Sequence, residues 1–493
     1  MRPTQLHISP IGLLLTLVMA GFSAGCAINP VSGAPDVVFM SESSEINIGS
    51  GNDAKIREKY GVYETPELQT YVNQVGQKLA AQSHRPGLSY HFTVLDSPAV
   101  NAFALPGGYI YVTRGILAYL NSEAELAAVL GHEIGHVTAR HGVRQYTAAT
   151  ATGFVGAIIG VATGIGATQD LFNNVFGNAI LSGYGRDHEL ESDRLGAEYL
   201  ARAGYDPQAM INVIGVLKHQ EEFEIKRATA ENRPPRIYHG VFASHPSADK
   251  RLQQVVGEAD RFKTLSTPVS ARAEYLKQID NLLFGEAARG GVRRGNHYYH
   301  RDFNFALSLP EGWEIEFDSY HVLRAVSRDK QAKLQIESEV QAPELTAKEF
   351  LNARMKVSEL DQAGPVKGQA LTSYTGVVPE SPTLGTNKTR AAVVYFNNRH
   401  FLFQGTAQDP GAFAVNDPLF LATARGLRAL TDKEKRLAGG LRLRTARATT
   451  GDTFATLAQK SAQVPYSESI LRLINNLFPD GEPKAGELIK IVE

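Results

Sequence analysis

The sequence has little cysteine: Cys26 is the single thiol in a chain of 493 residues. A lone cysteine has no partner within the chain, so an internal structural disulfide is excluded. A charge excess is also missing, because 50 lysines and arginines and 51 aspartates and glutamates give a formal net charge of −1. Proteins that bind nucleic acids normally carry a basic excess, so we expect no nucleic-acid partner.

Long apolar runs are absent as well, and none reaches the length of a transmembrane helix without interruption. The short run over 11–22, after a basic second residue, is typical of a signal peptide, here residues 1–25. The small residues before Cys26 resemble the cleavage site of bacterial lipoproteins, although Ser23 stands where those proteins usually have leucine. The resemblance implies a lipid-anchored periplasmic protein, with the outer membrane favoured because Ala27 follows the cysteine. The alternative is an ordinary cleaved signal that leaves Cys26 free or buried.

Composition and periodicity divide the rest of the chain into further segments. Small and polar residues over 26–50 predict a tether, and a mostly helical pattern then extends over 51–265. Residues 266–298 are expected to be a linker. Strand-like runs that flank a helix predict a small α+β domain over 299–433, in which no catalytic cluster is evident. The predicted fold class is therefore α+β.

The final segment, 440–493, is predicted to run strand, helix, helix, strand. Its opening Gly451-Asp-Thr and its closing Gly486-x-x-Ile-x-Ile resemble a LysM-like wall-binding module. This resemblance implies peptidoglycan as a partner. An insertion around Phe478 departs from the compact form of such modules, so a purely structural role stays open.

A histidine-rich motif occupies a predicted helix that opens at Ser122 and runs through His136. His132-Glu-Ile-Gly-His136 places two imidazoles four residues apart, on one face of the helix, where both can bind the same ion. Glu133 can reach a water molecule on that ion. Three ionisable groups inside an apolar run are costly to bury without a metal. The motif therefore predicts a zinc-dependent endopeptidase.

A second predicted helix supplies a third ligand, which a catalytic zinc site needs beside its water. Glu189 and Asp193 lie one turn apart on the same face, whereas Glu191 falls roughly opposite and should be solvated. We predict that Glu189 binds zinc and that Asp193 hydrogen-bonds a zinc-bound histidine or the reacting centre. The alternative is that both acids pair with nearby arginines.

The helix motif, the second acidic motif and a Pro-Gly-Gly hairpin at 101–112 together resemble one family. It is the zinc metallopeptidase family of the CAAX prenyl proteases and the bacterial protease HtpX, and the likeness is closest to its soluble, periplasmic lipoprotein branch. The resemblance covers about 50–265. It implies a mostly helical zincin-like (gluzincin) domain with a small sheet and one Zn²⁺ per chain. The ligands it implies are His132, His136 and Glu189.

The same resemblance implies that Glu133 is the catalytic base and that Asp193 has a proton-donor role. The chain lacks the multiple membrane spans of the prenyl proteases, so processing of prenylated substrates is not implied. Ser244-His245-Pro246 resembles a motif late in the peptidase domain of this branch, where His245 would approach the metal or line the cleft. A helix-capping turn is the alternative. The charge-free run 152–167 is either a lid or a closely packed buried helix.

The expected substrates follow from the hairpin beside the predicted site. A strand there can pair with an extended peptide through its backbone, which gives broad sequence tolerance. Unfolded or misassembled envelope proteins are therefore the substrates we expect, degraded as part of quality control. Two other functions stay open: hydrolysis of peptidoglycan crosslinks, which the final segment favours, and a non-enzymatic assembly chaperone that uses the same cleft.

Overall fold

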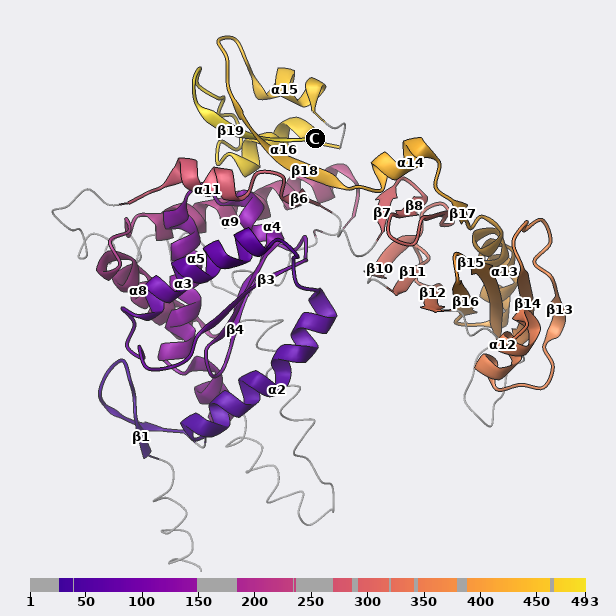
Figure 1. Cartoon of the computed structure of the whole chain (residues 1–493), viewed down its shortest axis with the longest axis horizontal. Helices are drawn as coiled ribbons and strands as arrows, with labels where there is room; N and C mark the ends of the chain where they lie inside the picture. Colours follow the sequence, from indigo (N-terminus) through magenta and orange to yellow (C-terminus); the bar gives the residue numbers. More distant parts are fainter. Residues whose placement is uncertain are drawn as a thin grey trace, which may run out of the picture. The chain divides into compact units, whose positions relative to one another are not determined.

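The protein is described from a computed structural model, which forms two compact units. The first unit comprises the chain up to Leu282 together with Arg442–Glu493, and the second comprises Leu283–Leu441 (Figure 1). The expected leader, the run 152–167 and His245 lie outside the described residues. The structure describes residues 26–38, 40–148, 184–233, 235, 269–285, 291–318, 321–340, 345–378, 388–461 and 465–493.

The first unit contains a three-stranded sheet in the order β3-β5-β4. The central strand β5 (Tyr109–Thr113) is parallel to β3 (His91–Leu95) and antiparallel to β4 (Ala102–Leu105). Strands β4 and β5 are the two arms of the predicted hairpin, which is confirmed. Gly107 and Gly108 have φ values of +81° and +92°, which glycine adopts without steric strain, so the Pro-Gly-Gly turn can be tight.

A buried helix, α5 (Glu123–Thr138), lies at the centre of this unit. It begins after Ser122, whose Oγ accepts a hydrogen bond from the Glu125 backbone N–H at 3.2 Å, as expected for an N-cap. The short helix α4 (Arg114–Tyr119) connects β5 to it. The helices that contact α5 are α3 (Pro66–Ala80), α8 (Arg186–Arg202), α9 (Ala209–Ala230) and α11 (Arg272–Gln278).

The segment expected to be a tether contains regular structure. Strand β1 (Cys26–Ile28) pairs with β2 (Pro35–Val37), and α2 (Glu42–Tyr60) follows. Glu45 of α2 is buried and accepts hydrogen bonds from Arg85 at 2.9 Å and from Arg140 at 3.1 Å. Arg140 comes directly after α5, so these ion pairs hold the N-terminal helix against the end of the central helix.

The final segment has the predicted order of strand, helix, helix and strand, and its two strands, β18 and β19, are antiparallel. Its elements are β18 (Leu441–Arg447), α15 (Phe454–Lys460), α16 (Ser467–Ile474) and β19 (Leu488–Val492). It is part of the first unit, since Phe478 and Leu473 pack against Phe223 of α9. The structure therefore joins to the helical domain a segment that the sequence treats as a separate module.

A buried lysine secures this contact. Lys490 of β19 is fully buried, and its Nζ donates hydrogen bonds to the carbonyl oxygens of Ala118 at 2.8 Å and Leu120 at 2.7 Å. Burial lowers the pKa of Lys490, and the negative charge of Glu125 opposes this shift. The lysine thus supplies donors to the carbonyl groups at the end of α4, which would otherwise be buried without partners.

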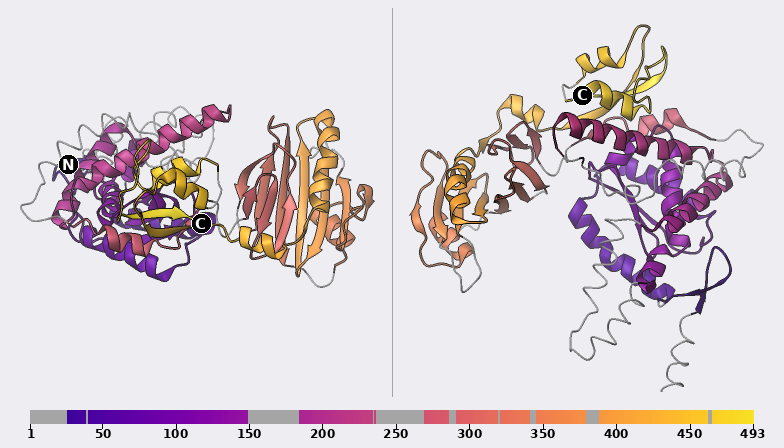
Figure 2. Two further views of the ribbon diagram at one scale, coloured as in Figure 1. Left: turned by 90° about the horizontal axis from the view of Figure 1, so that it is seen from above. Right: turned by 180° about the vertical axis from the view of Figure 1, so that it is seen from behind.

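The second unit contains a seven-stranded antiparallel sheet in the order β10-β11-β12-β16-β15-β14-β13 (Figure 2). Side chains of β15 alternate between its faces. Ala392 and Val394 pack with Phe413 and Phe420 of α13, whereas Val393 packs with α12. Its strands are β10 (Glu314–Asp318), β11 (Val322–Val326), β12 (Ala332–Val340), β13 (Asp361–Gly364), β14 (Ser373–Val378), β15 (Thr389–Phe396) and β16 (Arg399–Ala407).

The two helices α12 (Ala347–Met355) and α13 (Pro410–Arg425) therefore cover opposite faces of this sheet. A second sheet has the order β17-β9-β8-β7. The predicted α+β class is confirmed in both units. Among the described residues, no helix has both the length and the apolar composition needed to cross a membrane. The remaining elements are β6 (Leu283–Phe284), β7 (Val292–Arg294), β8 (His297–His300), β9 (Phe305–Ser308), β17 (Arg428–Ala429) and α14 (Asp432–Leu437).

We expect Lys490→Met to destabilise the first unit by about 2–6 kcal/mol, because two buried carbonyl groups lose their donors at about 1–3 kcal/mol each. Hydrogen exchange of the α4 and α5 amides measures this free energy without a contribution from the second unit. Lys484→Met is the matched control, since Lys484 is exposed on the same segment. Equal protection in both variants would show that the Lys490 contacts contribute nothing.

Candidate metal centre

The site is built where α5 and α8 approach each other through small residues. A Cβ placed on Gly135 would lie 3.0 Å from both the Cα and the carbonyl oxygen of Ser192, and one on Gly196 would lie 3.1 Å from the backbone nitrogen of His132. Such distances are tighter than ordinary van der Waals contact, so a side chain on either glycine would push the two helices apart. The two helix backbones are thereby close enough for Glu189 to reach the histidines of α5.

Three predicted ligands converge on one point. The Nε2 atoms of His132 and His136 are 3.0 Å apart. Glu189 Oε2 lies 3.2 Å from His132 Nε2, and Glu189 Oε1 lies 3.4 Å from His136 Nε2. All three side chains are buried, and their ligand atoms lie within 4.8 Å of one another. The structure thus brings together the residues that the two sequence motifs identified.

The spacing of these atoms fits a small divalent cation. Tetrahedral zinc with ligands at about 2.0–2.1 Å holds its ligand atoms about 3.3 Å apart, close to the observed separations. A proton on one imidazole nitrogen can form a hydrogen bond across only one of these three atom pairs. A cation between the atoms is bound by all three of them at once. Two imidazoles and a carboxylate are also a donor set that suits zinc.

Asp193 lies behind the first histidine. Its Oδ1 is 2.9 Å from His132 Nδ1, and the carboxylate is buried. Burial by itself would lower the pKa of His132, but the hydrogen bonds to Asp193 and Glu189 raise it to about 10. A cation bound at Nε2 would compete with a proton for the same nitrogen. The sequence left open whether Asp193 hydrogen-bonds a zinc-bound histidine or the reacting centre. The structure shows the hydrogen bond to His132, one of the predicted ligands.

Glu133 lies beside the ligands without a protein partner for one of its oxygens. The residue is buried, and among the described residues Oε1 has no hydrogen-bond partner. Burial raises the pKa of Glu133 to about 8; the neighbouring His132 opposes this, and the charge of Glu189 adds to it. A buried carboxyl oxygen is rarely left unpaired in a native protein, so its position indicates a partner that arrives with the reactants.

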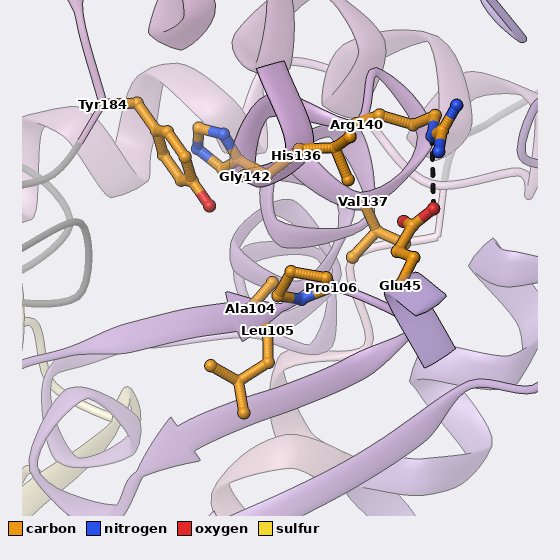
Figure 3. A pocket seen from close by; sticks show the side chains of 10 residues that line it. Glu45, Ala104, Leu105, Pro106, His136, Val137, Arg140, Gly142 and Tyr184 are labelled. Atoms are coloured by element: carbon orange, nitrogen blue, oxygen red, sulfur yellow. Dashed lines mark hydrogen bonds and ion pairs between the residues drawn. The ribbon is translucent and has the colours of Figure 1, made fainter. Parts of the chain in front are cut away.

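A pocket opens between His136 and the edge of the small sheet. Figure 3 shows His136 with Tyr184 beside it, opposite Ala104 and Leu105 of β4. The ring of Tyr184 stacks on His136 with centroids 4.2 Å apart, a contact that the sequence analysis missed. The pocket is lined by Glu45, Ala104, Leu105, Pro106, His136, Val137, Arg140, Gly142, Val143 and Tyr184.

The prediction for Glu191 is wrong. Its carboxylate is partly buried and paired: the side chain is 24% exposed, and its Oε2 lies 3.0 Å from both His141 Nε2 and Arg144 Nη1. The chain after α5 returns alongside α8 and covers the helix face that the sequence assigned to solvent. His141, also missed, is fully buried, and its Nδ1 lies 2.8 Å from His136 Nδ1. No local pattern identified this contact.

Two other residues that the sequence analysis singled out, His245 and Cys26, are not among those that the structure brings to the metal site. His245 lies outside the described residues, so its distance to the ligands is undefined. Cys26 is the first residue of β1, where its backbone pairs with Val37.

The comparisons with known proteins concern the part of the chain that carries these ligands. Residues 66–259 match the model of peptidase family M48. The beta-barrel assembly-enhancing protease of Yersinia pestis is 29% identical over 292 residues, which cover 54% of this chain and 55% of that protein. Its namesake from Escherichia coli (strain K12) is 28% identical over 322 residues, 59% of this chain and 62% of that protein.

A mitochondrial relative matches a shorter segment of the chain. The mitochondrial metalloendopeptidase OMA1 of Arabidopsis thaliana is 39% identical over 129 residues, 26% of each chain. The chain spans less than two thirds of the length of the bacterial relatives. The likeness to these relatives therefore covers part of each protein and not its whole length.

Glu189→Ala should abolish stable metal binding, because two histidines alone do not form a closed three-ligand site. We expect about one metal ion per chain in the wild type and much less than one in the variant, measured by elemental analysis after dialysis. Asp187→Ala is the control, since Asp187 is an exposed acid in the same turn of α8 and should leave the metal content unchanged. Full occupancy in Glu189→Ala would rule out Glu189 as a ligand.

Proposed function

Because residues 66–259 match the model of peptidase family M48, whose members depend on a metal, we propose that this protein is a zinc-dependent endopeptidase of the bacterial cell envelope. One observation carries the proposal: His132, His136 and Glu189 converge on one point, with the unpaired oxygen of Glu133 beside it. We assign the three converging residues as zinc ligands. The single ion per chain follows from the single cluster found among the described residues.

Zinc bound there would lower the pKa of a water molecule to about 7 and would polarise the scissile carbonyl. The chain's own groups handle the proton. Glu133 accepts it from the attacking water at Oε1 and returns it to the nitrogen of the leaving amine. Asp193 holds His132 in the orientation that directs Nε2 toward the ligand cluster. We therefore assign Asp193 to positioning a ligand in place of proton donation.

The strand beside the pocket supports the choice of peptides as substrates. β4 ends the described three-stranded sheet, and Ala104 and Leu105 of β4 line the same pocket as His136. An extended peptide can bind such a strand through its backbone, so selection rests on the peptide being unfolded and less on its sequence. Folded domains do not present an extended segment of this kind.

We propose that the substrates are unfolded or misassembled envelope proteins. The bacterial relatives are named for enhancing β-barrel assembly, and they share the peptidase domain. A protease that binds and cleaves only extended chains is suited to removing outer-membrane proteins that fail to assemble. A periplasmic location with a lipid on Cys26 completes this proposal, since the motif before Cys26 is the feature that would place the enzyme at the outer membrane.

Wall binding by the final segment is a further part of the proposal. Its strand-helix-helix-strand order supports a LysM-like module. Hydrolysis of peptidoglycan crosslinks is less well supported, because peptides that contain D-amino acids pair poorly with a strand built for L-peptides.

Glu133→Gln should keep the metal and the fold but lower the cleavage of unfolded casein by about 10²–10⁴-fold, the usual contribution of a general base. The amide preserves the shape of the side chain and cannot take up the proton. Metal content and circular dichroism of the variant serve as controls. Activity within a few-fold of the wild type would mean that another group transfers the proton.

The metal-loaded protein should cleave reduced, carboxymethylated α-lactalbumin at least tenfold faster than the native protein, because only the unfolded chain offers an extended segment to β4. Gel electrophoresis of timed samples measures both rates. Purified peptidoglycan should release no soluble peptides under the same conditions. Equal cleavage of both forms of α-lactalbumin, or release of wall peptides, would refute this choice of substrates.

A further inference from the structure

A chain of hydrogen-bonding groups leads away from the second histidine of the ligand cluster. His136 Nδ1 lies 2.8 Å from His141 Nδ1, and His141 Nε2 lies 3.0 Å from Glu191 Oε2. Arg144 Nη1 donates to the same carboxylate oxygen at 3.0 Å. We propose that His141 and Glu191 form a relay that positions His136 as a metal ligand. This inference rests on the proposed metal site and adds two residues to it.

Metal binding fixes the direction of every hydrogen bond in this relay. A histidine that binds through Nε2 must carry its proton on Nδ1, so His136 donates from Nδ1. His141 Nδ1 is then the acceptor, which places the His141 proton on Nε2, and that proton points to Glu191. The opposite order would put a proton on His136 Nε2, between it and the metal. Of these two orders, only the first leaves the ligand nitrogen free.

The surroundings of His141 hold its ring in this position. The side chain is fully buried, and the ring of His188 stacks on it with centroids 4.3 Å apart. Arg144 holds the far end of the relay through Glu191. A ring that is packed on its face and hydrogen-bonded at both nitrogens has little freedom to rotate, so His136 has a partner with a fixed direction.

The two ligand histidines are thus held in different ways. Asp193 contacts His132 directly at 2.9 Å, whereas Glu191 reaches His136 only through His141. Carboxylates that hydrogen-bond metal-bound histidines orient the ring and raise its basicity, and their loss typically costs 10–100-fold in metal affinity. Both carboxylates come from α8, so one helix supplies a ligand and the support of both histidines.

Zinc dissociation constants, measured by competition with a coloured chelator on the full-length protein, test the relay without any assay of proteolysis. We expect His141→Phe, which keeps an aromatic ring but cannot hydrogen-bond, to weaken zinc binding about 10–100-fold. Glu191→Gln should weaken it less, since the amide oxygen still accepts a hydrogen bond. Glu198→Gln is the matched control: Glu198 also pairs with arginines on α8, and the variant should bind zinc like the wild type.

A double variant separates a relay from a general structural effect. In a relay Glu191 acts only through His141, so His141→Phe/Glu191→Gln should bind zinc within about twofold of His141→Phe alone. His141→Phe should also change the visible absorption of the cobalt-substituted protein, which reports the ligand geometry. Glu191 is partly exposed and glutamine has nearly the same shape, so we expect Glu191→Gln to fold. Its zinc affinity then still tests the relay if His141→Phe does not fold.

Two results would overturn the relay: wild-type zinc affinity in both single variants, or a double variant whose loss is the product of the single losses. Either result leaves the proposed function intact as long as the wild-type protein binds zinc and cleaves casein. A wild-type protein that binds no zinc would refute the proposed function itself.

Discussion

The metal centre depends on the close approach of two helix backbones, α5 and α8. Gly131, Gly135 and Gly196 lie at this contact, where a methyl group on Gly135 would meet the backbone of Ser192. Helix α5 alone would supply two histidines and no third ligand. At this separation Glu189 reaches both imidazoles, and Asp193, one turn further along α8, reaches the far side of His132. The geometry of the site is therefore set by the packing of these two helices.

The sequence predicted those parts of the site that depend on a single helix. The spacing of His132 and His136 fixes their common face, and the same argument distinguished Glu189 from Glu191 as the ligand candidate. The Pro-Gly-Gly hairpin was predictable for a similar reason, since its turn is determined by adjacent residues. In each case the information lies within a few residues of the chain.

Contacts between distant segments were not predictable in this way. Glu191 looked solvated because its helix face was judged without the chain that follows α5 and covers it. Glu45, in a polar stretch, gave no sign of pairing with Arg85 and Arg140. Lys490 alternates with apolar residues in a strand and has the pattern of a surface lysine, yet it is fully buried. Each of these charged residues has a partner that lies at least about 40 positions away in the sequence.

The interrupted course of the first unit determines when the peptidase core can be completed during synthesis. Its last 52 residues, Arg442–Glu493, follow the entire second unit in the chain. Domains generally fold as the chain emerges from its N-terminus, and the ligand helices emerge long before Lys490 does. Until then the carbonyl groups at the end of α4 lack the donors that β19 supplies. The protein therefore reaches its final packing only after the second unit has been synthesised, so the helices that carry the candidate metal ligands are made before the contacts that complete the first unit.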